Sequence, residues 1–260
     1  SNKGHVQAMY KYGISLSNTK ESIRLFKKAS DKGNIDSMFL YALLIANKNE
    51  YSDPIPASKY IKIAADNGHA DAMAYYGNML LFEEENGNNK EEAIRYLKNG
   101  IEKGSAEAMK NYAFFKQYGS DVDKVKAVKY YKMAIEKGNS EAMNNYGCML
   151  QYGDGIDINK QEAIKYYKMA IEKGNPVSMY NYAYMLDIGD GIEINKEEAA
   201  KYYKMSIKQG YAEAMCNYAY MLDNDMNANK EEVIRYYKMA IEKGNSVAMF
   251  NYAYMLDIGD

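Results

Sequence analysis

A repeat of 34 to 36 residues runs through this chain of 260 residues and restricts the folds that it can adopt. A glycine that follows a short charged stretch recurs at this spacing, at Gly33, Gly68, Gly104, Gly138, Gly174, Gly210 and Gly244. After a first interval of 29 residues, a methionine series keeps the same spacing, at Met9, Met38, Met73, Met109, Met143, Met179, Met215 and Met249. Two independent markers with one period predict a chain built from copies of one supersecondary unit.

The unit at 175–210 shows what each copy forms. Both of its halves carry apolar residues at intervals of three and four, which is typical of an amphipathic helix. Asn175 before Pro176 is a common helix start, and Gly210 is a common helix stop in the left-handed conformation. The pattern predicts a hairpin of two helices, here named helix A and helix B, joined by a loop.

Polar residues at the expected helix starts support this interpretation. An asparagine precedes a glutamate by three residues, as in a capping box, at Asn89/Glu92, Asn159/Glu162, Asn195/Glu198 and Asn229/Glu232. His5 and His69 occupy positions where other units carry asparagine. We therefore predict that both histidines cap helices and do not act in catalysis.

One hairpin cannot bury the apolar stripes of both helices, so neighbouring hairpins must stack. A small residue recurs in helix A, where a neighbouring helix can approach closely, at Gly13, Ala42, Gly77, Ala113, Gly147, Ala183, Ala219 and Ala253. The predicted fold is all-α, a right-handed α-α superhelix (solenoid) of stacked helical hairpins forming a single repeat domain over 1–260. Its units are 5–33, 34–68, 69–104, 105–138, 139–174, 175–210, 211–244 and a partial unit 245–260.

The two ends of the sequence both fall inside a repeat. Residues 1–5 match the close of a helix B, and residues 256–260 copy 186–190 and stop before the loop and the next helix B. We therefore expect further repeats on both sides in the full protein.

The order of these signals resembles a known family. Residues 152–174 read YGDGIDINKQEAIKYYKMAIEKG, and 188–210 read IGDGIEINKEEAAKYYKMSIKQG. The Gly-x-Gly-Ile loop, the polar cap and the A-x-x-Y-Y helix resemble the Sel-one-like repeat (SLR) family, which is related to the tetratricopeptide repeats (TPRs). The resemblance implies a protein–protein interaction scaffold or adaptor of the kind that assembles signalling and membrane-associated complexes.

Composition excludes several classes of protein. The formal net charge of −2 argues against a nucleic-acid binder, which needs an excess of basic residues. Apolar runs are far shorter than the ~20 residues needed to cross a bilayer, so no membrane insertion is expected in this segment. Cys148 and Cys216 lie two repeats apart, too far for a disulfide. Unpaired cysteines favour a reducing compartment such as the cytoplasm, although any targeting segment would lie outside this stretch.

Catalytic and cofactor motifs do not emerge from the sequence. The loop at 153–162 faintly resembles a calcium-binding loop, which needs acidic ligands at positions 1, 3 and 5. Asp154 is followed by Gly155 and Ile156, so this spacing fails. The paired tyrosines of helix B recur in every well-formed unit, which favours packing over a cofactor site. We expect no enzyme, no cofactor and no metal. A hydrolase, proposed for cysteine-rich relatives, lacks a nucleophile here.

The candidate binding site is a face of helix A beside its apolar stripe. The resemblance to TPRs implies that helix A lines the concave side, so that asparagines, aromatics and acidic residues would share a groove. The predicted peptide groove comprises Asn111, Phe114, Asn145, Cys148, Tyr180, Asn181, Tyr184, Asp187, Asn217, Tyr220, Asp223, Asn251 and Tyr254. An alternative is that the asparagines bond neighbouring repeats and the tyrosines only pack.

The site favours a non-enzymatic scaffold that binds a protein or an extended peptide. Basic side chains on this partner would suit the aspartates of the groove. A helical-repeat RNA-binding protein is an alternative, because such repeats can read one base each. A regulatory repeat region of a larger signalling enzyme is another.

Overall fold

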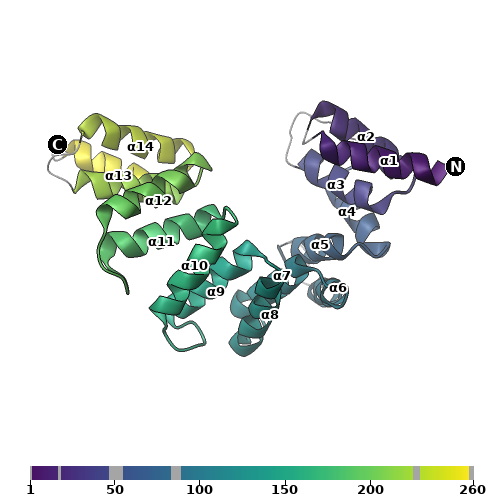
Figure 1. Cartoon of the computed structure of the whole chain (residues 1–260), viewed down its shortest axis with the longest axis horizontal. Helices are drawn as coiled ribbons and strands as arrows, with labels where there is room; N and C mark the ends of the chain where they lie inside the picture. Colours follow the sequence, from purple (N-terminus) through teal and green to yellow (C-terminus); the bar gives the residue numbers. More distant parts are fainter. Residues whose placement is uncertain (1, 17–18, 47–54, 83–88, 225–228, 258–260) are drawn as a thin grey trace. The chain divides into compact units, whose positions relative to one another are not determined.

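The computed structural model describes residues 2–16, 19–46, 55–82, 89–224 and 229–257, and within them the chain forms fifteen α-helices and no strand (Figure 1). The A helices are α1 (Asn2–Ser15), α3 (Ile35–Ala46), α5 (Ala70–Phe82), α7 (Ala106–Tyr118), α9 (Ser140–Tyr152), α11 (Pro176–Ile188), α13 (Ala212–Asp223) and α15 (Ser246–Asp257). The B helices are α2 (Lys20–Asp31), α4 (Ala57–Asp66), α6 (Lys90–Glu102), α8 (Lys124–Glu136), α10 (Lys160–Glu172), α12 (Lys196–Lys208) and α14 (Lys230–Glu242). The predicted all-α fold of helical hairpins is confirmed in these residues.

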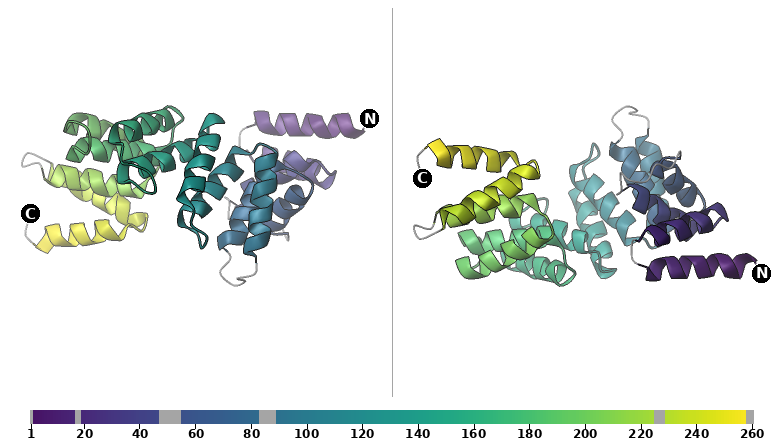
Figure 2. Two further views of the ribbon diagram at one scale, coloured as in Figure 1. Left: turned by 90° about the horizontal axis from the view of Figure 1, so that it is seen from below. Right: turned by 90° about the horizontal axis from the view of Figure 1, so that it is seen from above.

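The chain divides into two compact units, unit 1 (Ser1–Gly138) and unit 2 (Asn139–Asp260). The division falls at one of the repeat borders that the sequence predicts. Inside each unit, an A helix packs against the B helix of its own repeat and against the preceding B helix (Figure 2). Successive A helices also contact each other, as α5 does with α7 and α11 with α13. Residues 258–260, at the end of the predicted partial unit 245–260, lie outside the described residues, and so does residue 1.

The close approach of helix A to helix B depends on the small residue in helix A. A Cβ atom on Gly147 would lie 2.8 Å from Cε1 of Tyr167, and one on Gly13 would lie 2.8 Å from Cε1 of Phe26. Tyr167 belongs to a set of fully buried tyrosines in helix B, which are Tyr131, Tyr167, Tyr203 and Tyr237. The prediction that these tyrosines form core packing is confirmed.

The predicted helix caps are mostly confirmed. Oδ1 of Asn159 accepts a hydrogen bond from the backbone N–H of Glu162 at 3.0 Å, and Asn195 does the same for Glu198 at 2.9 Å. Asn229 accepts from the N–H of Glu231 instead of Glu232. Asn89 makes no capping bond through its side chain, because its own backbone is already helical (φ −86°, ψ −6°).

The two histidines differ in role. Nδ1 of His69 accepts a hydrogen bond from the backbone N–H of Ala72 at 3.1 Å, so His69 caps α5 as predicted. The prediction for His5 is wrong. Helix α1 already begins at Asn2, so His5 lies inside the first turns and no helix starts there for it to cap.

In unit 2, the glycine-containing loop after α11 also contacts the preceding repeat. Asp190, in the loop after α11, accepts a hydrogen bond from Nε2 of Gln151 at 2.7 Å and pairs with Lys160 at the start of α10. A Cβ on Gly191 would lie 2.4 Å from the Cβ of Lys160, and its backbone has a positive φ of 74°. Only glycine fits this contact, because the conformation and the space both exclude a side chain.

Candidate functional site

Three asparagines of the predicted groove, Asn111, Asn181 and Asn217, connect successive A helices. Nδ2 of Asn111 donates to the carbonyl of Ala74 at 3.2 Å, and Nδ2 of Asn217 donates to the hydroxyl of Tyr180 at 3.0 Å. Nδ2 of Asn181 donates to Oδ1 of Asn144 at 2.9 Å.

Each of these bonds crosses to the preceding repeat, as the alternative interpretation expected for the asparagines. Asn111 is buried, whereas Asn145, Asn181, Asn217 and Asn251 are half-buried. The amides therefore hold the repeats in register.

The aromatic positions of the predicted groove are the accessible ones. Phe114 is 39% exposed, Tyr220 55% and Tyr254 59%. Tyr184 is half-buried and stacks on Tyr180, with ring centroids 6.3 Å apart. These rings offer rigid apolar area at low conformational cost, which suits a binding surface.

Cys148 takes the place of an aromatic residue in this series, and its thiol is enclosed. The hydroxyl of Tyr167 lies 3.3 Å from its Sγ, and Nδ2 of Asn181 lies 3.5 Å from it. Burial raises the pKa of the Cys148 thiol, and the hydrogen bonds from Tyr167 and Asn181 offset this only in part. A protonated, enclosed thiol is a poor nucleophile, so Cys148 is a packing residue in this face.

The acidic part of the predicted groove needs one correction. Asp187 is 6% exposed; its carboxylate pairs with Lys196 and accepts a hydrogen bond from the buried hydroxyl of Tyr203 at 3.4 Å. Asp187 is therefore engaged inside the chain and does not offer its charge to a partner. Asp223 and Asp257 are exposed.

Sequence reasoning missed the last turn of helix A. Tyr118 is 60% exposed, Tyr152 65% and Ile188 50%, and each lies four residues after a predicted groove position. The same helical spacing that linked the asparagines to the aromatics would have found them. We name the exposed apolar surface of helix A the helix-A face, defined by Phe114 and Tyr118 in unit 1 and by Tyr152, Ile188, Tyr220 and Tyr254 in unit 2.

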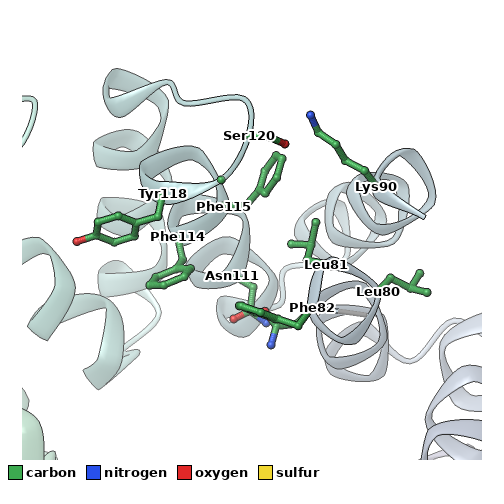
Figure 3. Close-up of a pocket in the computed structure, with 11 residues that line it drawn as sticks. Leu80, Leu81, Phe82, Lys90, Asn111, Phe114, Phe115, Tyr118 and Ser120 are labelled. Atoms are coloured by element: carbon green, nitrogen blue, oxygen red, sulfur yellow. The ribbon is translucent and has the colours of Figure 1, made fainter. Parts of the chain in front are cut away.

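A cavity of about 430 Å³ opens beside the helix-A face of unit 1 (Figure 3). The side chains that line it come from α5, the start of α6, α7 and the loop after α7. They are Asn78, Leu80, Leu81, Phe82, Lys90, Asn111, Phe114, Phe115, Tyr118, Gly119 and Ser120. Its walls are mainly apolar, with Lys90 and Ser120 at one end and Asn111 near the other.

In the described ranges, no group of three or more His, Cys, Asp or Glu side chains is placed to hold a metal ion. None of the described helices is long and apolar enough to cross a membrane.

Stacked helical hairpins of one length, with small residues at the helix crossings, define a helical-repeat protein. The model of the Sel1 repeat family matches residues 4–34, 70–105, 106–139, 140–175, 176–211, 212–245 and 246–260. The chain therefore belongs to the Sel1 repeat family, as its sequence suggested. Residues 35–69 are outside the match, although α3 and α4 form a hairpin there.

Solved structures with this fold come from several organisms. A Sel1 repeat protein from Oxalobacter formigenes has a TM-score of 0.73 and 22% identity, covering 92% of this chain and 99% of that chain. The protein c5321, a protective antigen of uropathogenic Escherichia coli with an SLR fold, has a TM-score of 0.64 and 22% identity, covering 100% of this chain and 58% of that chain. Yeast Tom70 has a TM-score of 0.61 and 16% identity, covering 96% of this chain and 54% of that chain.

These structures share the fold with this chain, and two of them are much longer than it. No curated protein sequence matches the chain. Sel1 and TPR-like repeats generally mediate protein–protein interactions, and the Sel1 repeat scaffold is typically non-catalytic.

Proposed function

We propose that this chain is a non-enzymatic scaffold that binds a segment of a partner protein on the helix-A face. The observation that carries the proposal is the exposure of large apolar side chains along this face in successive repeats. Tyr220 and Tyr254 occupy the same position of two neighbouring repeats, and each leaves more than half of its side chain in solvent. Exposed apolar side chains that gather on one face are typical of interaction sites.

The asparagines support this function from inside the structure. Because they bond successive A helices, they fix the spacing of the aromatic side chains in each unit. A surface that is ordered before binding loses less entropy when a partner docks. In unit 2 the exposed carboxylates of Asp223 and Asp257 suit a segment that carries Lys or Arg.

Selection from a phage-displayed random peptide library tests the proposal. Peptides selected on the wild-type protein should bind the double variant Tyr220→Ser with Tyr254→Ser at least about tenfold more weakly, since aromatic contacts carry about 1–2 kcal/mol each on truncation. The matched control is Lys165→Ser with Lys173→Ser. These two exposed lysines belong to helix B and its C-terminal end, and their removal should leave the affinity unchanged.

The proposal would be refuted if the lysine substitutions of the control abolished peptide binding and the tyrosine substitutions left it unchanged. Titration with single-stranded RNA at increasing salt separates the alternative function. Binding to RNA that weakens steeply with salt would favour a nucleic-acid reader.

A further inference from the structure

The cavity in unit 1 lies beside a position of helix A that varies between repeats. The position of Asn78 in α5 carries an aromatic residue in four other repeats, as Phe114, Tyr184, Tyr220 and Tyr254. Asparagine is much smaller, so the space between α5 and α7 is left open. Its volume of about 430 Å³ falls within the range of about 300–1,000 Å³ that is usual for ligand clefts.

The apolar walls of the cavity are large and partly exposed. Phe82 is 64% exposed and Phe114 39% exposed, while Phe115 is buried in the wall. Figure 3 shows Leu81 of α5 across the cavity from Phe114 and Phe115 of α7. A branched or aromatic side chain of a partner would be enclosed on two sides.

Two asparagines, Asn78 and Asn111, are among the residues that line this cavity. Nδ2 of Asn111 is bonded to the carbonyl of Ala74, so its Oδ1 remains as an acceptor. Asn78 is half-buried, and its side chain makes no hydrogen bond to another described residue. Two side-chain amides with unused donors and acceptors can pair with the backbone of an extended segment.

A positive charge lies at the other end. Lys90, the first residue of α6, forms no ion pair with another described residue, and its Nζ lies 5.6 Å from the ring centroid of Phe115. The neighbouring Asp121 is paired with Lys116, whose hydrogen bond is the main cause of the lowered pKa of Asp121; Lys90 contributes less. The rim therefore offers an ammonium group that suits a carboxylate.

We propose that this cavity binds a peptide segment in which a large apolar side chain is followed closely by an Asp or Glu. The apolar side chain fills the space left by Asn78, the backbone pairs with the two asparagine amides, and the carboxylate meets Lys90. This rests on the proposed function, since it specifies what the helix-A face of unit 1 takes. Its charge preference is opposite to the one that Asp223 and Asp257 suggest for unit 2.

The test uses short fluorescein-labelled peptides with a central Leu or Phe among Gly and Ser, and with Asp, Asn or Lys placed near it. In anisotropy titrations the wild-type protein should bind the Asp peptides about threefold to fivefold more tightly than the Lys peptides, as expected for one exposed ion pair. Lys90→Glu should reverse this preference. The control Lys98→Glu makes the same change of charge at an exposed position of α6. It should not reverse the preference for the Asp peptides.

A second variant tests the cavity itself. Asn78→Tyr installs the residue type that other repeats carry at this position, so it should keep the melting temperature while it fills the space. Binding of every peptide in the set should then be lost. The proposal is overturned if no peptide binds the wild-type protein, if Asn78→Tyr binds as the wild type does, or if Lys90→Glu leaves the charge preference unchanged.

The same peptides separate this proposal from the general one. Tyr220 and Tyr254 do not line the cavity, so their serine variants should bind the Asp peptides normally. If library peptides bind through these tyrosines while the Asp peptides fail, the proposed function stands and the cavity assignment fails.

Discussion

Gly147 offers a test of how the two helices of a repeat fit together. A Cβ at this position would lie 2.8, 3.0 and 3.3 Å from three atoms of the Tyr167 ring. Real contacts of this kind stay above about 3 Å, so the ring would have to move by a few tenths of an ångström. The ring is fully buried, and its hydroxyl donates to Oε1 of Gln151 at 2.8 Å, so it cannot turn away freely.

Two substitutions at this glycine should therefore differ. Gly147→Ala gains about 1 kcal/mol of helix propensity, which offsets the displacement of the ring. Alanine also occupies this position as Ala113 and Ala183, in repeats whose helix B carries Tyr131 and Tyr203 at the position of Tyr167. We expect the free energy of unfolding to change by less than about 1 kcal/mol. Gly147→Leu adds a side chain to a filled core and should cost about 1–3 kcal/mol or more through overpacking.

Urea denaturation followed by far-UV circular dichroism measures both values. A matched control is Ile14→Leu, an exposed position in another A helix, which should leave the midpoint unchanged. A Gly147→Leu protein as stable as the wild type would contradict the close crossing. A Gly147→Ala protein that is destabilised as much as the leucine variant would also contradict it, because the two variants differ in the size of the side chain.

Two further predictions concern buried polar groups. Asp187→Gln should retain most of the stability, because glutamine can still accept from the hydroxyl of Tyr203, whereas Asp187→Leu should cost about 1–3 kcal/mol by leaving that buried hydroxyl without an acceptor; equal losses in urea denaturation would contradict this. Burial, with a smaller contribution from Glu213, raises the pKa of Cys216 to about 11. An acid whose pKa is higher in the folded state stabilises the fold least at high pH, so the contribution of Cys216 should fall from about pH 8.5, where an unfolded thiol ionises, towards pH 11. Cys216→Ala should therefore show a shallower loss of stability over that range, and identical slopes would refute the assignment.

Much of the fold could be read from the sequence, because the repeat multiplies every local signal. A lone Asn before a Glu is weak evidence for a helix start, but its recurrence with a closing glycine is strong. Two of the predicted caps were nevertheless wrong. Asn89 and His5 resemble caps in sequence, but the backbone around each is already helical. Local pattern identifies a group that can cap a helix, and only the backbone conformation decides whether it does.

The candidate site was harder to predict because residues on one helical face can point to a partner or to the next repeat. Asn181 and Tyr220 lie on the same predicted face, yet one bonds to Asn144 and the other is 55% exposed. The distinction depends on the rotation of each helix against its neighbour, which the period does not specify. The cavity was missed for a related reason. Asn78 is one of several non-aromatic residues at its position, and only the structure shows the space beside it.

One position near the end of helix A has a structural role in three repeats. Gln117, Gln151 and Asp187 all occupy it, and each accepts a hydrogen bond from a buried tyrosine hydroxyl of helix B. In these three repeats the position needs an acceptor, because an unpaired buried hydroxyl is costly. The same position carries Leu81 in α5 and the exposed Asp223 and Asp257 in α13 and α15, so the requirement does not hold in every repeat. The position three residues earlier faces no such demand and holds Asn78 in one repeat and Tyr220 in another. Specificity for a partner can vary only where the core imposes no requirement, so these variable positions are where the binding preferences of the two units should differ.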